Sequence, residues 1–136
     1  MPISVFPERF LCFFRQPIEY KVAFKPCPYV GNEFLVITAL FLVHNNSGTI
    51  HARQGKLDLA LREFDAALAI YVYPAALSNK ARVLAMLERW AECVDTVEQL
   101  VKLDERQRDN LRRDNVYDKL RREPTFGPRF QRLVDG

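Results

Sequence analysis

An internal repeat with a period of 33 residues is the feature of this 136-residue chain that most constrains its fold. When the sequence is aligned with itself at that offset, small residues meet small residues and apolar residues meet apolar residues. The aligned pairs are Asn46/Asn79, Gly48/Ala81, Ala52/Ala85, Leu57/Trp90, Ala60/Cys93, Phe64/Val97, Ala67/Leu100 and Ile70/Leu103. Such self-similarity is typical of stacked supersecondary units, each of which buries a face against its neighbour.

Each unit is predicted to be a helical hairpin. Ala60, Phe64 and Ala67 follow i, i+4 and i+7 spacing, which places them on one face of a helix. Gly48 and Ala52 share a face of the preceding helix in the same way. Small residues on both faces allow the two helices to approach closely, and one large residue wedges between them. Alanine is therefore expected at buried positions where leucine would bury more area.

Helices are predicted over residues 33–53, 57–71, 75–87, 90–103, 107–122 and 126–134. Gly55 is expected to end the first of them, because glycine adopts the left-handed conformation at little cost. The short connections should make neighbouring helices antiparallel. Residues 1–32 contain five of the eight prolines, which forbid long helices there. This Pro- and Phe-rich segment is predicted to be irregular, either as ordered structure or as a poorly ordered extension.

The repeat resembles the tetratricopeptide repeat (TPR) family, whose pattern is W-x2-L-G-x2-Y, then A-x3-F, then P. The first copy matches this pattern at Gly48, Ala60, Phe64 and Pro74, whereas His44, Ser47 and His51 replace its bulky apolar residues. The second copy has Ala81, Cys93 and Val97 at the equivalent positions. The resemblance covers residues 42–104.

This resemblance implies an all-α fold over residues 33–136, in which antiparallel helical hairpins stack as a short TPR-like solenoid. The repeats are placed at about 42–74 and 75–107. Residues 108–136 resemble the closing segment of such arrays, where a short helix and a D/E-P-x-F turn, here Glu123 to Phe126, form a C-terminal cap. If neither this cap nor the helix before residue 43 covers the stack, the chain is expected to self-associate.

The resemblance also implies a non-enzymatic protein–protein interaction module, in which the first helices line a concave groove for a peptide or a partner helix. Carried over to this chain, the binding residues are Asn45, Thr49, Arg53, Ser78, Arg82 and Met86. The two arginines suit an acidic or C-terminal carboxylate ligand, because a guanidinium binds a carboxylate in a bidentate manner. The asparagines and lysines of the carboxylate clamp in chaperone-binding TPR domains are not matched.

The arginine-rich C-terminus supports an alternative function. From Glu105 to the end there are nine basic and six acidic residues. The alternative is a basic helical protein that binds RNA or another nucleic acid. Few aromatic residues lie between these arginines for base stacking, and the net charge is only +3. Mixed-charge helices with i, i+4 pairs, such as Asp109–Arg113 and Asp118–Arg122, are therefore the preferred interpretation.

No catalytic or metal-binding motif is recognised, and no cofactor is expected. His44 and His51 would stand about 10 Å apart along one helix, too far to bind one metal ion. Cys93 aligns with Ala60 and is predicted to be a buried small residue. With Cys12 and Cys27 it makes an odd number of cysteines, which argues against a disulfide framework and for a reducing compartment, predicted to be the cytoplasm.

The longest apolar run extends from Phe34 to Val43. As a helix its ten residues span about 15 Å, half of the roughly 30 Å of a bilayer core. No transmembrane span is therefore expected. The run is predicted to be a buried helix, with a short membrane-surface segment as the alternative.

Overall fold

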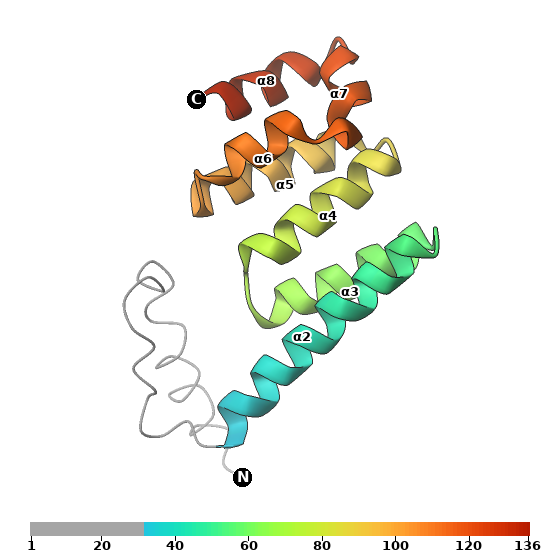
Figure 1. The fold of residues 1–136 in the computed structure, drawn as a ribbon, viewed down its shortest axis with the longest axis vertical. Coiled ribbons are helices and arrows are strands. Elements are labelled where there is room, and N and C mark those ends of the chain that lie inside the picture. The colour runs from blue at the N-terminus through green and yellow to red at the C-terminus, as the bar shows by residue number, and fades with distance from the viewer. Residues whose placement is uncertain (1–31) are drawn as a thin grey trace. The chain divides into compact units, whose positions relative to one another are not determined.

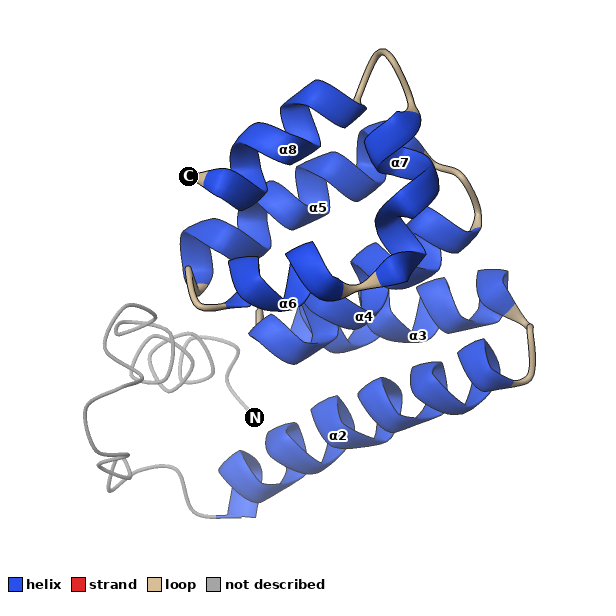
Figure 2. Ribbon diagram, turned by 45° about the horizontal axis from the view of Figure 1, so that its top comes forward, coloured by secondary structure: helices blue, strands red, loops and turns tan. Residues whose placement is uncertain are grey.

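The computed structural model describes residues 32–136, in which every regular element is a helix (Figures 1 and 2). The all-α class predicted from the sequence is confirmed for this part of the chain. The predicted irregular segment 1–32 lies outside the described residues apart from Asn32. The elements are α2 (Asn32–Arg53), α3 (Leu57–Ile70), α4 (Pro74–Met86), α5 (Trp90–Leu103), α6 (Gln107–Arg113), the 3-10 helix η1 (Asn115–Tyr117), α7 (Asp118–Arg122) and α8 (Gly127–Asp135).

The backbone repeats with the same 33-residue period as the sequence. Helices α3 and α5 both contain 14 residues, and their first residues, Leu57 and Trp90, stand one period apart. The turns before them also match, since Gly55 has a φ of 75° and Glu88, at the equivalent position, has a φ of 58°. The following backbone N–H groups, of Lys56 and Arg89, donate to carbonyl oxygens five residues earlier at 2.9 and 3.0 Å. The two hairpins therefore share one local geometry.

The packing inside the first hairpin explains its small residues. A Cβ atom added to Gly48 on α2 would lie 2.7 Å from Cε1 of Phe64 on α3. Phe64 is 1% exposed, and Ala60 and Ala67 beside it are fully buried. The phenyl ring thus occupies the space that a side chain at residue 48 would need. Close approach of the two helices requires glycine here for its size and not for its backbone freedom.

The second hairpin, α4 and α5, uses the equivalent positions. The thiol of Cys93 donates a hydrogen bond to the carbonyl oxygen of Ala81 at 3.4 Å. Val97, which aligns with Phe64, is fully buried. Because Ala81 already carries a methyl group where the first hairpin has glycine, a smaller residue than phenylalanine fills the space opposite it.

The prediction of a single helix over 107–122 is wrong, because the helix is interrupted at Asp114. Its backbone is extended, with φ −79° and ψ 117°, and its side chain accepts a hydrogen bond from the backbone N–H of Val116 at 3.1 Å. Aspartate competes with helical hydrogen bonds in this way and favours a new N-terminus. The segment therefore forms α6, η1 and α7 in place of one helix.

Helices α6 and α8 pack on α5, and η1 packs on α4, at the end of the layered helices opposite α2 (Figures 1 and 2). The rings of Tyr117 and Phe130 stack with their centroids 5.2 Å apart, and both residues are buried. Before α8, the Glu123 carboxylate accepts a hydrogen bond from the backbone N–H of Phe126. The turn expected from Glu123 to Phe126 is therefore present and leads directly into α8.

The apolar run at the start of α2 is not the buried helix that the sequence predicted. Phe41 is buried, but Leu40, Leu42 and Val43 are 47%, 48% and 61% exposed. The physical reason is position in the fold, since α2 is the first helix of residues 39–136 and the helices that follow contact only one of its faces. Within residues 32–136, no helix has the length and apolarity required to cross a membrane.

Candidate functional site

The candidate binding residues divide between the first helices of the two hairpins. Asn45, Thr49 and Arg53 lie on α2, and the others follow one period later on α4. The amide nitrogen of Asn79 donates to the side-chain oxygen of Asn45 at 3.4 Å, which joins the two helices. Asn79 was not among the predicted residues, although its alignment with Asn46 marks it as part of the repeat. The structure thus brings α2 and α4 together beside the first candidate residue.

Exposure separates the six candidate residues into two groups. Asn45, Thr49 and Ser78 are half-buried, and the hydroxyl of Thr49 donates to the carbonyl oxygen of Asn45 at 3.0 Å. The longer side chains of Arg53, Arg82 and Met86 are exposed. The solvent-accessible chemistry at these positions is therefore two guanidinium groups and one thioether.

Arg82 already has one partner within the chain. Its Nη1 lies 3.1 Å from Oδ2 of Asp114, the residue between α6 and η1. The Arg82 side chain remains 50% exposed, whereas that of Asp114 is 18% exposed. Arg53, in contrast, has no carboxylate within 4.0 Å among residues 32–136. Spacing along the sequence could not reveal the Arg82–Asp114 pair. The two residues stand 32 positions apart, with Arg82 on α4 and Asp114 between α6 and η1.

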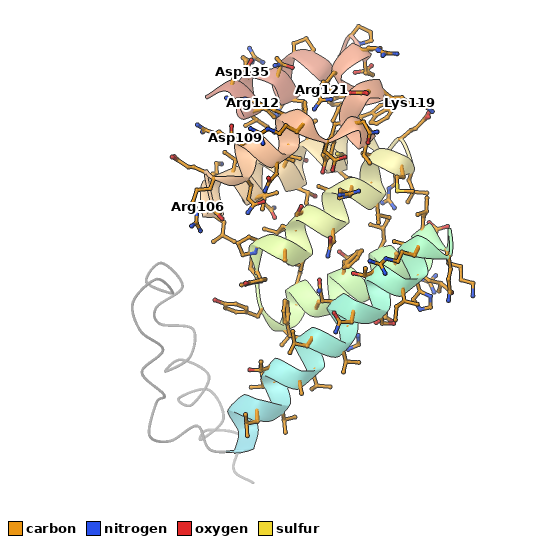
Figure 3. All side chains as sticks on the ribbon, in the orientation of Figure 1. Arg106, Asp109, Arg112, Lys119, Arg121 and Asp135 are labelled. Carbon is orange, nitrogen blue, oxygen red and sulfur yellow. The ribbon has the colours of Figure 1, made fainter. Side chains whose placement is uncertain are left out.

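Two of the C-terminal arginines join the C-terminal helices to one another (Figure 3). Nη2 of Arg112 donates to the carbonyl oxygen of Val134 at 2.8 Å, near the end of α8. Nη2 of Arg121 donates to the carbonyl oxygens of Leu111 and Arg112, each at 2.7 Å, near the end of α6. Cations at helix C-termini satisfy unpaired carbonyls and interact favourably with the helix dipole. These two guanidinium groups are thus part of the fold.

The predicted i, i+4 ion pairs in this segment are wrong by one residue. Asp109 pairs with Arg112, at 2.9 Å, and Asp118 pairs with Arg121. Residues at i, i+3 and at i, i+4 both lie on one helix face. Which arginine pairs with each aspartate therefore depends on the other contacts that the arginine makes. Arg112 and Arg121 are held by the carbonyl groups described above, which places them beside the aspartates. Among the residues that the structure describes, Arg113, Arg122 and Arg132 have no carboxylate within 4.0 Å.

Arg129 connects α8 to α5. Its Nη2 lies 2.9 Å from an oxygen of Asp95 and 2.6 Å from an oxygen of Glu98. Hydrogen bonds from Lys102 and Arg129 hold the pKa of the Glu98 carboxyl below its ordinary value. This cluster lies on the surface and pairs opposite charges, as expected for a mixed-charge helix face.

The two histidines lie on α2, where they contact the hairpin. Nδ1 of His44 is 2.7 Å from an oxygen of Glu63 on α3, which links the helices of the first hairpin. His51 is half-buried, and its Nδ1 is enclosed without a hydrogen-bond partner in the described part of the chain. Nowhere in residues 32–136 do three or more His, Cys, Asp or Glu side chains form a group that could bind a metal ion.

Cys93 is fully buried, as the alignment with Ala60 predicted. Burial raises the pKa of its thiol from an ordinary value of 9.0 to about 12. The thiolate, the reactive form, is therefore disfavoured across the physiological range.

This burial makes the stability of the protein depend on Cys93 at alkaline pH. Above pH 9.0 the thiol ionises in the unfolded chain but not in the folded one. The contribution of Cys93 to the free energy of unfolding is therefore fully present below that pH. It falls as the pH rises towards 12, with a slope approaching about 1.4 kcal/mol per pH unit. We expect urea denaturation between about pH 8 and about pH 11 to show this loss in the wild type. The Cys93→Ala variant should lack this contribution, and equal slopes for the two proteins would contradict the assignment.

No known family model matches the sequence, and comparisons with curated proteins and with solved structures gave no match.

Proposed function

We propose that this chain is a cytoplasmic, non-enzymatic protein–protein interaction module of the TPR type, a short solenoid that binds a peptide or a partner helix in a groove lined by α2 and α4. The observation that supports this most directly is the repeated hairpin. Helices α3 and α5 have equal length and matching turns at a 33-residue offset. Stacked hairpins of this kind create extended surfaces for binding.

The exposed arginines indicate the chemistry of the ligand. Arg53 has no carboxylate partner among residues 32–136, and Arg82 keeps half of its side chain exposed beside Asp114. A guanidinium presents several donors in one plane and can bind a second carboxylate while it retains the first. Met86 adds an adaptable apolar contact at the same face. An acidic peptide, or one with a free C-terminal carboxylate, fits this combination.

Fluorescence anisotropy with a labelled acidic peptide that carries a free C-terminal carboxylate tests this proposal. The Arg53→Glu/Arg82→Glu variant is expected to bind this probe at least about tenfold more weakly, since one charge-assisted hydrogen bond is worth about 1.5–3 kcal/mol. The matched control is Lys56→Glu/Arg62→Glu, which makes the same charge change at exposed positions outside the six candidate residues. Thermal melting of both variants accounts for any stability lost with the Arg82–Asp114 pair.

The same assay separates the groove from the nucleic-acid alternative. A single-stranded RNA probe should bind weakly, and any binding should weaken steeply as salt rises, because it depends on phosphate neutralisation. Strong RNA binding that the Arg113→Glu/Arg122→Glu/Arg132→Glu variant abolishes would support the alternative. Equal loss of peptide binding in the groove variant and its control would count against a specific groove.

A further inference from the structure

Helix α2 presents an apolar face without a partner among the described residues. Val43 and Ile50 are 61% and 54% exposed, and Leu40 on the same side of the helix is 47% exposed. The helix contains no Asp, Glu, Lys or Arg between Glu33 and Arg53. Monomeric proteins seldom expose large contiguous apolar patches, and an uncharged helix face of this kind marks an interaction surface.

The repeat identifies what this face is built to contact. One period later, the residues equivalent to Val43 and Ile50 are Ala76 and Val83, which are 0% and 2% exposed. Ala76 packs in one apolar cluster with Phe41 and Ala67 of the preceding hairpin. The equivalent of Asn46 is Asn79, whose amide bonds to Asn45 on α2. In the second hairpin this face is thus buried against another helical layer, whereas in the first it is exposed.

We propose that the exposed face of α2 is a homodimer interface, in which α2 of a second copy of this chain packs on it in the antiparallel orientation. The opposite end of the layered helices is covered by α6 and α8, which contact α5, and by η1, which contacts α4, while α7 packs on η1 and α8. A head-to-tail contact between hairpins is therefore blocked, and identical faces are left to meet. Two identical faces generate a closed, two-fold dimer.

The spacing along α2 fits this helix pair. Val43 and Ile50 stand seven residues apart, and Asn46 lies three residues after Val43 and four before Ile50. Apolar residues at heptad spacing line one seam of a helix pair, and one polar asparagine in the seam fixes its register. The antiparallel orientation places Val43 against Ile50 of the partner subunit and Asn46 near the two-fold axis. It also separates the two copies of Arg53, which a parallel orientation would bring together.

Charge argues for a second copy over a lipid surface. Helices that lie in a membrane interface carry lysine and arginine on their polar face. Arg53, at the last position, is the one lysine or arginine of α2, and the helix also contains Glu33. This inference does not depend on the proposed groove, because Asn45 and Thr49 lie on a different side of α2 from Val43 and Ile50.

Sedimentation velocity of the full chain over a roughly hundredfold range of concentration tests the interface. The wild type is expected to form a dimer. Val43→Glu/Ile50→Glu should weaken it by about 100-fold or more, because each interface would bury unpaired carboxylates. Both side chains are exposed, so the fold should tolerate the change, which circular dichroism verifies. The control Leu59→Glu/Met86→Glu makes the same change at residues that are 42% and 51% exposed outside this face, and it should remain dimeric.

A cross-link tests the register. In a Cys12→Ser/Cys27→Ser background, Asn46→Cys should form a disulfide-linked dimer with oxidised glutathione, whereas Arg62→Cys should not. A wild type that stays monomeric over the whole concentration range would overturn the proposal, including the case in which the monomer binds anionic vesicles through this face. A dimer that persists in Val43→Glu/Ile50→Glu, or an Asn46→Cys variant that fails to cross-link, would equally overturn it.

Discussion

Replacing Phe64 by alanine is expected to lower the free energy of unfolding by about 3–5 kcal/mol, the cost of removing a buried phenyl ring and leaving a cavity. Phe64 is 1% exposed and fills the space beside Gly48, between α2 and α3. Its neighbours Ala60 and Ala67 are small and cannot fill the space that the ring would leave. Urea denaturation followed by circular dichroism measures the loss.

A double-mutant cycle with Gly48→Val shows whether the ring and the glycine form one unit. Gly48→Val alone should cost about 1–3 kcal/mol, because its side chain would overlap the ring. In the Phe64→Ala background the valine enters space that the ring has vacated, so its cost should fall sharply or change sign. A coupling energy of about 2 kcal/mol or more is expected. Additive effects would mean that the two residues do not determine the helix spacing together.

Replacing Phe130 by alanine is expected to destabilise the protein by about 3–5 kcal/mol and to loosen the C-terminal helices. Phe130 is fully buried, stacks on Tyr117 and lies 5.8 Å below the Arg121 guanidinium carbon. Its loss therefore removes an apolar contact and a cation–π contact from the C-terminal helices. Native-state hydrogen exchange should show faster exchange in α6, α7 and α8 than in α3.

Tyr117→Phe is the matched control for this prediction. The Tyr117 hydroxyl is buried without a hydrogen-bond partner among the described residues, and burial raises its pKa. Removing an unsatisfied buried hydroxyl while keeping the ring should leave stability unchanged or raise it by about 1 kcal/mol. A large destabilisation by Tyr117→Phe would show that the hydroxyl has a partner, such as a buried water molecule.

The bounds of α3 and α5 could be predicted from local patterns in the sequence. Helix α5 spans the predicted residues, and α3 ends one residue before its predicted end, because apolar spacing and the turn at Gly55 are both local signals. The same repeat predicted a large residue wedged between helices that approach closely at small residues, and the structure shows Phe64 in that place against Gly48. The candidate binding residues were carried over from the resemblance to TPR proteins, and their function stays a prediction.

The features that the sequence did not predict depend on contacts between distant residues. Asp114 ends α6 and also pairs with Arg82, a contact that no spacing rule identifies. Arg112 and Arg121 contact helix ends 22 and 10 residues away, which changed their aspartate partners. The exposure of Val43 and Leu42 depends on which helices exist to cover α2. Composition shows that these residues are apolar but not that their face lacks a neighbour.

The left-handed turn at Glu88 has a consequence for how such a protein changes during evolution. Gly55 and Glu88 adopt nearly the same backbone conformation, although that conformation costs a residue other than glycine about 1–2 kcal/mol. The hydrogen bonds of the turn and the packing of the helices on either side hold the glutamate there. Selection can therefore preserve the hairpin while the glycine that marks it in the sequence is lost. Backbone angles thus show that the two hairpins are equivalent at a position where their residue types differ.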